Sequence, residues 1–589
     1  MQVFIKVQTF MFCVQPRLIA SFTIQVKTRS NVHRALAVMG ALCRNHAVKE
    51  AETDSWMEEL NHVMAVEAIP DEVTLVQLIE SCYHIFSAYL AKVDVETKCS
   101  ALRALGGIFV SRPRVLLAME QSGAIAELMS DNSMPEIQLQ ALRSWREILL
   151  AEEDRVASGE AKAKMEANAS VTLSKKIQGD QDSDATLVGG VLSQHANRLF
   201  QLTACRNPLI RFAAVELLGH LLRQGLINPM QAVPFLFGLQ GDVESPNIRS
   251  FALKLLTIES EKRPEMIRQR VNAGIKQAYR FQRHVYPNQD VTAVIQTQNG
   301  DKLVIDSMFS SVFKDCIRSS TKNKTGLFRN LLSLFEIDES NDAKKKEKGT
   351  TAVEMIPLLS FVSQVLAHLP YNTVNDPLFL IYHMQGQVAL QGQQLVDKLT
   401  TFLQSQGVPS VTVHDELNTQ EDALEIAATK RHPSRSKEAS AVNKADFELG
   451  QFVDMCAQAS AFVLLLRLKS FLRTAYNISE ARCLEYSPDA KERNWDKIST
   501  SPNFPSVFDA TIKSFFRSEP QSKKASVKHM SSREISRDAL IKQYAEFRAL
   551  MRVEQAADIK LDSDDEDESK KRKLKNVMED EDQGDVMEG

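Results

Sequence analysis

The sequence predicts an all-α fold: an α-solenoid of repeated helix pairs, with disordered inserts and an acidic C-terminal tail. Apolar residues recur at helical spacing along most of the 589 residues, and strand-like alternation between turns is scarce. Hydrophobic residues make up 44% and charged residues 25%, which is the composition of a folded chain and excludes a collagen-like or wholly disordered one. A local pattern also recurs with a period near 40 residues.

The period appears when residues 207–218 are laid over residues 245–256, where Pro, Ile, Arg, Ala and a closing Leu-Leu pair coincide. The same register recurs upstream, so that equivalent positions are occupied by Lys98, Gln138, Arg211 and Arg249. A period near 40 with a polar residue early in the second helix and Ala three residues later is typical of HEAT repeats. Each pair then buries its apolar face by stacking on the next pair. An irregular helical bundle is the alternative.

Composition along the chain predicts the domain organisation. The longest interval between anchors contains a polar stretch, residues 152–184, that we interpret as an inserted loop. The segments expected are 1–30, atypical; 31–339, the repeat array with its insert at 152–184; 340–405, further helical repeats; 406–444, a disordered charged insert; 445–515, a C-terminal helical region; 516–559, a helical extension; and 560–589, a disordered acidic tail. The atypical first segment favours a Met1 that is not the natural start, and a naturally shortened chain is the alternative.

Cysteine usage and hydropathy indicate the compartment. Eight cysteines are scattered singly, without a Cys-x-x-Cys pair, which is typical of a reducing compartment. Lys6 and Pro16 interrupt the apolar stretches at the N-terminus, so a secretory signal is not expected. No uncharged apolar run reaches the length of a membrane span, so we expect no membrane partner and a cytosolic or nuclear protein.

Sequence motifs for catalysis are missing. The chain has no phosphate-binding GxxxxGK[ST], GxGxxG, HExxH or GxSxG motif and no Cys/His spacing suited to zinc. We therefore expect a protein that is not an enzyme, with no catalytic residues, no metal and no cofactor. The alternative is an enzyme whose site assembles only in three dimensions. His220, on a leucine-rich helix, is interpreted as a packed core residue.

One predicted helix, residues 265–283, separates an apolar face from a cationic face. At 100° per residue, one arc holds Ile267, Val271, Ile275, Ala278 and Phe281, and another holds Arg268, Lys276, Arg280 and Arg283. From residue 262 to 283 there are seven basic residues against the single acid Glu265. Such a stripe could neutralise phosphates of double-stranded DNA without reading the sequence. The alternative is a solvated face that meets acidic neighbours.

The last 29 residues carry twelve acids and five bases, which leaves residues 1–560 at a net charge of about +3. Ser563 lies in an acidic setting suited to phosphorylation by acid-directed kinases. A nuclear-import tetrad is predicted at Lys570, Lys571, Arg572 and Lys573. A solvated tail that binds nothing is the alternative.

Five blocks, in order, resemble the C-terminal region of the Nipped-B family, the HEAT-repeat subunit of the cohesin loader. The first, Leu221-Leu-Arg-Gln-Gly-Leu-Ile-Asn-Pro-Met-Gln-Ala-Val-Pro-Phe-Leu236, departs from the family pattern at Asn228 and Ala232. The others are Ala273-Gly-Ile-Lys-Gln-Ala-Tyr279, Phe328-Arg-Asn-Leu-Leu-Ser-Leu-Phe335, Leu369-Pro-Tyr-Asn-Thr-Val-Asn-Asp-Pro-Leu-Phe379, and Leu464-Leu-Leu-Arg-Leu-Lys469 followed by Tyr486-Ser-Pro488. The resemblance covers roughly residues 32–505.

The resemblance implies a nuclear, chromatin-associated scaffold that is not an enzyme. Family members hold DNA against the cohesin ATPase heads, contact the SMC and kleisin subunits, and stimulate ATP hydrolysis by cohesin, on which sister chromatid cohesion depends. Their N-terminal extension binds a TPR-type partner, and this chain begins inside the array, so that partner is in doubt here. The runner-up is a transport or vesicle-coat solenoid that binds a protein cargo, in which the basic stripe would be incidental.

Overall fold

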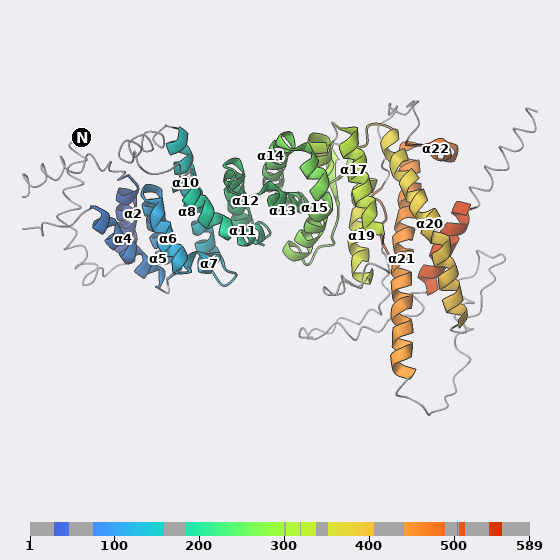
Figure 1. Cartoon of the computed structure of the whole chain (residues 1–589), viewed down its shortest axis with the longest axis horizontal. Helices are drawn as coiled ribbons and strands as arrows, with labels where there is room; N and C mark the ends of the chain where they lie inside the picture. Colours follow the sequence, from blue (N-terminus) through green and yellow to red (C-terminus); the bar gives the residue numbers. More distant parts are fainter. Residues whose placement is uncertain are drawn as a thin grey trace, which may run out of the picture. The chain divides into compact units, whose positions relative to one another are not determined.

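The computed structural model describes residues 29–45, 75–92, 94–157, 184–299, 302–317, 320–336, 352–405, 441–488, 504, 506–512 and 541–555. These residues are helical apart from turns and one β-hairpin, which confirms the all-α class (Figure 1). The chain divides into two compact units. The first comprises residues 1–255 and 280–288, and the second comprises residues 256–279 and 289–589. Residues 1–28 of the predicted first segment and the whole of the predicted tail, 560–589, lie outside the described residues.

The first unit is a row of stacked helices. They are α2 (Arg29–Asn45), α4 (Leu75–Leu90), α5 (Val95–Ser111), α6 (Leu116–Gln121), α7 (Ala124–Met129), α8 (Pro135–Ala157), α10 (Asp184–Gln194), α11 (Ala196–Leu202), α12 (Pro208–Arg223), α13 (Pro229–Gly238) and the start of α14 (Pro246–Lys262). Helix α5 packs on α8, and α8 packs on α12. The polar insert was placed too early, because α8 continues to Ala157; residues 158–183 lie outside the described part.

The predicted repeat register is confirmed. Lys98, Gln138, Arg211 and Arg249 each lie near the start of a long helix, α5, α8, α12 and α14 respectively. The alanines three residues later, at positions 101, 141, 214 and 252, are all 0% exposed. A methyl side chain lets neighbouring backbones approach closely, so these alanines set the spacing of the stack. Proline opens three of the four helices, where its missing N–H costs no hydrogen bond.

In three of the four repeats, the polar anchor bonds to the turn that precedes its own helix. Gln138 Nε2 donates to Ser130 O at 2.6 Å, and Arg211 Nη1 donates to Cys205 O and Arg206 O at 2.9 and 3.0 Å. Arg249 Nη1 donates to Asp242 O and Val243 O at 2.6 and 3.1 Å. Turn carbonyls that no helix satisfies thus receive side-chain donors.

Helices α2 and α5 cross at a pair of glycines. A Cβ added at Gly107 would lie 2.3 Å from Gly40 O, and one added at Gly40 would lie 2.6 Å from Ala104 Cα. Only the absence of a side chain permits this backbone contact. The crossing therefore depends on residue size at two positions.

The second unit contains the longer helices. Its elements are the first part of α15 (Pro264–Val285), β1 (Val294–Asn299), β2 (Lys302–Ser307), α16 (Ser310–Val312), a π-helical turn (Phe313–Ile317), α17 (Thr321–Leu332), α19 (Ala352–Ala367), α20 (Asn375–Ser405), α21 (Ala441–Tyr476), α22 (Glu480–Glu485) and a helix at residues 541–555. Helix α21 packs against α19 and α20. It begins inside the insert predicted at 406–444, of which residues 406–440 lie outside the described part. Within the described residues one stretch, Phe452–Tyr476 of α21, has the length and hydropathy of a membrane span, but 78% of its apolar window is buried, as in a core helix.

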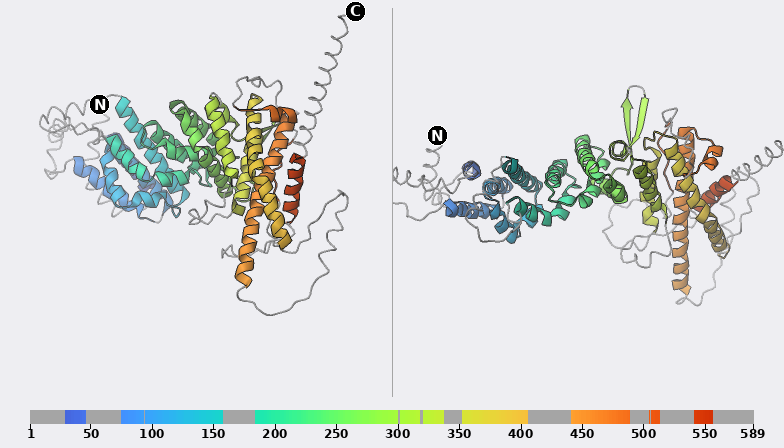
Figure 2. Two further views of the ribbon diagram at one scale, coloured as in Figure 1. Left: turned by 45° about the vertical axis from the view of Figure 1, so that its right-hand side comes forward. Right: turned by 45° about the horizontal axis from the view of Figure 1, so that its top comes forward.

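The hairpin β1–β2 was not predicted. Its strands pair antiparallel from Val294 opposite Ser307 to Asn299 opposite Lys302 (Figure 2). The Ser307 N–H donates to the carbonyl oxygen of His368 at 3.2 Å, which ties the hairpin to the end of α19. Because Asn299 pairs with Lys302, the two residues between the strands are Gly300 and Asp301, and a Gly-Asp pair at this place is the local signal that could have predicted the hairpin.

Candidate nucleic-acid interface

Helix α15 buries the face that the sequence predicts. Ile267, Val271, Ile275, Ala278 and Phe281 are at most 2% exposed. Because the helix completes a turn every 3.6 residues, burying these five positions directs the basic positions between them to the sides of the helix. The predicted apolar face of α15 is therefore confirmed.

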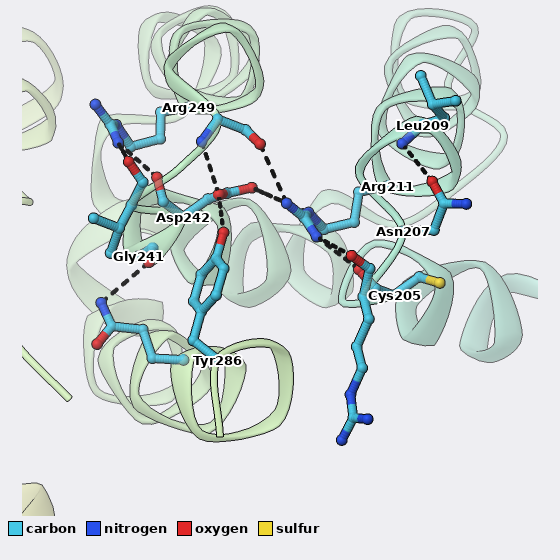
Figure 3. A network of polar contacts seen from close by, with 12 residues as sticks. Cys205, Asn207, Leu209, Arg211, Gly241, Asp242, Arg249 and Tyr286 are labelled. Atoms are coloured by element: carbon cyan, nitrogen blue, oxygen red, sulfur yellow. Dashed lines mark hydrogen bonds and ion pairs between the residues drawn. The ribbon is translucent and has the colours of Figure 1, made fainter. Parts of the chain in front are cut away.

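A buried polar network holds the C-terminal end of α15 (Figure 3). Arg211 Nε donates to Asp242 Oδ2 at 3.0 Å, and the hydroxyl of Tyr286, just after α15, donates to Asp242 Oδ1 at 2.6 Å. Gln282 Nε2 donates to Gly241 O at 3.1 Å. The Arg211 guanidinium also lies 5.7 Å from the centre of the Phe281 ring. These contacts fix the last turn of α15 against the turn that precedes α14.

Asp242 and Arg211 form a desolvated ion pair, with side chains 0% and 2% exposed. The Ser245 N–H donates to Asp242 Oδ1 at 3.0 Å, so the carboxylate has partners on both oxygens. Burial raises the pKa of Tyr286 above its usual value, and the hydrogen bond to Asp242 raises it further. Tyr286 therefore stays protonated and acts as a donor. A buried ion pair persists only with such a full set of hydrogen bonds.

The four predicted basic residues differ in exposure. Arg280 and Arg283 are exposed, whereas Arg268 and Lys276 are half-buried. The Arg268 guanidinium lies 4.0 Å from Glu265, and its stem covers Gly326 of α17, where an added Cβ would be 2.3 Å from Arg268 Cδ. Arg268 thus serves largely in packing α15 on α17. Arg280 and Arg283 are the predicted residues best placed to meet a ligand.

Arg206 is a basic residue that the sequence did not reveal as part of this surface. Its Nε donates to the carbonyl oxygen of His284 at 3.2 Å, and its side chain is exposed. It therefore joins Arg280 and Arg283, and we call these three residues the α15 basic end. Arg206 lies 78 residues before His284, so only the tertiary fold brings them together. Cations at a helix C-terminus are also favoured by the helix dipole.

An acid close to the α15 basic end is already paired. Asp131 accepts a hydrogen bond from Arg198, which holds the pKa of that carboxyl below its usual value, and His284 is near enough to contribute. Asp131 therefore pairs with Arg198.

In the described part of the chain, no group of three or more His, Cys, Asp or Glu side chains is arranged to hold a metal ion. His220 is buried, as predicted, and burial lowers its pKa. The phosphorylation candidate Ser563 and the import tetrad Lys570 to Lys573 lie outside the described residues.

Residues 188–386 match a family described as "Sister chromatid cohesion C-terminus", Nipped-B C-terminal. This part of the chain is therefore similar to the C-terminal region of Nipped-B proteins. Nipped-B-like protein of Homo sapiens is 22% identical over 91% of this chain and 18% of that protein. Nipped-B protein of Drosophila melanogaster is 21% identical over 85% and 22%, and sister chromatid cohesion protein mis4 of Schizosaccharomyces pombe is 23% identical over 45% and 16%. The chain spans about a fifth of the length of these relatives or less.

The fold is also similar to that of a solved structure. The Chaetomium thermophilum cohesin loader SCC2, C-terminal fragment, superposes with a TM-score of 0.54 at 15% identity, over 81% of this chain and 29% of that one. This likeness concerns the fold. All the residues of the α15 basic end lie within residues 188–386, the part of the chain that matches the family.

Proposed function

We propose that this chain is a cohesin-loading factor, a scaffold without catalytic chemistry that engages DNA and cohesin. The observation that carries the proposal is the match of residues 188–386 to a sister chromatid cohesion domain. In this proposal the chain contacts cohesin SMC and kleisin subunits, stimulates ATP hydrolysis by cohesin and supports sister chromatid cohesion on chromatin in the nucleus. A contribution from a TPR-type partner is not part of the proposal.

Within this function we assign the α15 basic end to duplex DNA. Arg280 and Arg283 are exposed, Arg206 lies beside them, and the Asp242 network anchors the helix that carries them. A cationic surface on a rigid support binds phosphates with little ordering cost, and it carries no base-reading geometry. Lys276 and Arg268 are assigned a secondary role because both are half-buried.

The DNA assignment is tested by the salt dependence of binding to a labelled duplex. Affinity is expected to fall by orders of magnitude between about 50 and 200 mM salt, and charge reversal at Arg280 and Arg283 should lower the log–log slope by about 2. Charge reversal at two exposed arginines elsewhere, Arg34 and Arg143, is the matched control with the same change in net charge. Equal slopes for the two double variants would remove α15 from the DNA surface.

The cohesin assignment has an independent test. The chain should co-purify with SMC and kleisin subunits and raise the rate of ATP hydrolysis by purified cohesin in the presence of DNA. Recovery of coat proteins or transport GTPases in their place would favour the cargo-binding solenoid. A chain that binds DNA and leaves cohesin hydrolysis unchanged would contradict the loader function while leaving the DNA surface intact.

A further inference from the structure

The helix at residues 541–555 lies beside α20 and α21 in every view (Figures 1 and 2). Its buried positions recur every three or four residues, which places them on one face. They are Gln543, Tyr544, Phe547 and Met551, flanked by half-buried Glu546, Leu550 and Glu554. The helix thus occupies a groove formed by α20 and α21, in the mode of an amphipathic helix in a hydrophobic groove.

Apolar contacts line the middle of this groove. Phe547 is fully buried and stacks on Phe462 of α21, with ring centres 6.1 Å apart. Met551 covers Gly392 of α20, where an added Cβ would be 2.9 Å from the methionine Cε. The hydroxyl groups of Tyr544 and Thr400 share a hydrogen bond of 2.7 Å. Burial of these side chains supplies most of the attraction.

Two cations on α21 select the charge of the occupant. Lys469 pairs with Glu554, and Arg467 pairs with Glu546. With the helix seated, Lys469 is only 4% exposed, so its ammonium depends on the carboxylate of the occupant. A buried cation that loses its partner is strongly destabilising. The groove therefore favours a helix with acids eight residues apart, on the same face as its apolar residues.

The chain's own helix fits this groove imperfectly. Gln543 is 2% exposed, and its Nε2 has no hydrogen-bond partner in the structure. A buried donor without a partner weakens the packing, and an apolar residue at this position would avoid that cost. A 15-residue helix is also marginal alone in water, so these residues need the groove to stay helical.

We propose that the groove between α20 and α21 is a docking site for an acidic amphipathic helix of a partner protein, and that residues 541–555 compete for it in cis. The partner helix carries apolar residues at positions matching 543, 544, 547 and 551, and acids at positions matching 546 and 554. Its docking requires neither DNA nor cohesin, so this inference stands apart from the loader function.

The cis helix and the groove belong to one chain, so the effective concentration of the helix at the groove is on the order of 1 mM. Displacement in trans should therefore be weak until the cis helix is disabled. The probe is a fluorescent peptide of residues 539–557, and the protein is the full chain carrying Phe547→Asp and Met551→Asp. This variant should bind the peptide at least tenfold more tightly than the wild-type chain does.

A charge swap tests the groove itself. Adding Lys469→Glu to the disabled chain should weaken binding of the wild-type peptide at least tenfold, and a peptide with Glu554→Lys should recover it. A Gln543→Leu peptide should bind about tenfold more tightly than the wild-type peptide, because the unsatisfied donor is gone. A folded disabled chain that binds no peptide, or that ignores the charge swap, would overturn the proposal.

If the disabled chain does not fold, hydrogen exchange on the wild-type chain gives the answer. Excess Gln543→Leu peptide should accelerate exchange of the amides of residues 541–555, and a peptide with Glu546→Lys and Glu554→Lys should not. Unchanged exchange with the first peptide at millimolar concentration would overturn the proposal.

Discussion

A single buried carboxylate, Asp242, joins three parts of the first unit through Arg211, Tyr286 and Ser245. Asp242→Ala would leave the Arg211 guanidinium buried without its counter-charge, and we expect a loss of about 3–5 kcal/mol in the free energy of unfolding. Asp131→Ala is the matched control, because it removes an ion pair whose carboxylate is 88% exposed, and should cost less than about 1 kcal/mol. Urea unfolding measures both. Similar losses for Asp242→Ala and Asp131→Ala would mean that the Asp242 network contributes little to the free energy of unfolding.

His368 makes the second unit sensitive to acid. Its ring lies against Phe471 and Phe504, and its Nε2 accepts the N–H of Phe508 at 2.9 Å. Burial lowers the pKa of His368 to about 4, below the value of about 6.5 in an unfolded chain. The unfolded state therefore binds more protons between these values, so stability is complete above about pH 6.5 and declines as the pH falls towards 4.

The test compares wild type with His368→Gln, which keeps an acceptor and cannot titrate. The free energy of unfolding, measured by urea titration, should fall more steeply between pH 6.5 and 4.5 for the wild type than for the variant. The extra loss in the wild type should be at most about 3 kcal/mol. Parallel pH profiles would show that other groups cause the acid sensitivity.

At the scale of elements, the crossing of α2 and α5 depends on two glycines in contact. Gly107→Ala pushes a methyl group into the backbone of Gly40, so we expect α2 to move and the free energy of unfolding to fall by about 1–3 kcal/mol. Gly190→Ala on α10 is the control, since an added Cβ there meets nothing within 4 Å and the change should stabilise by up to about 1 kcal/mol. A loss for both variants would point to helix propensity and not to the crossing.

Local patterns predicted the helices and their buried faces well. Spacing alone located the apolar side of α15 and the four buried alanines, because burial follows the helical period. The same reasoning could not place Arg206 beside His284 or assign Arg268 to packing on α17, since both depend on contacts between residues far apart in the sequence. The hairpin was missed because the helical periodicity of the surrounding sequence outweighed the single Gly-Asp turn signal at residues 300–301.

The resemblance blocks also meet in the fold. Phe328 lies 5.7 Å from Tyr371 and 6.2 Å from Phe379, ring centre to ring centre, and the Tyr486 hydroxyl donates to Asn375 Oδ1 at 2.8 Å. Three of the five blocks therefore build one part of the core. The resemblance therefore predicted the architecture, because its blocks supply core residues. The candidate DNA surface had to be inferred separately, from the positions of basic residues on α15.

Charge divides the whole molecule unevenly, with about +3 on residues 1–560 and a strongly acidic remainder. Like charges repel, so the acidic residues should oppose DNA binding at low ionic strength. A chain ending at residue 560 should bind duplex DNA more tightly than the full chain at 50 mM salt, and the difference should shrink at 200 mM. A full-length variant with the twelve terminal acids changed to amides should behave like the shortened chain. Equal affinities at 50 mM would exclude competition by the tail.

The anchors Gln138, Arg211 and Arg249 reach back only five to eight residues to the carbonyls they satisfy. Each side chain therefore reaches its acceptors only when the turn before its helix has one particular length. Adding or removing one residue inside that turn would leave a guanidinium or amide without its acceptors, whereas extra residues between successive pairs would disturb no such contact. We therefore expect related chains to differ in the number of residues between successive helix pairs, as this chain does after α8. The number of residues in the turn inside each pair should stay constant.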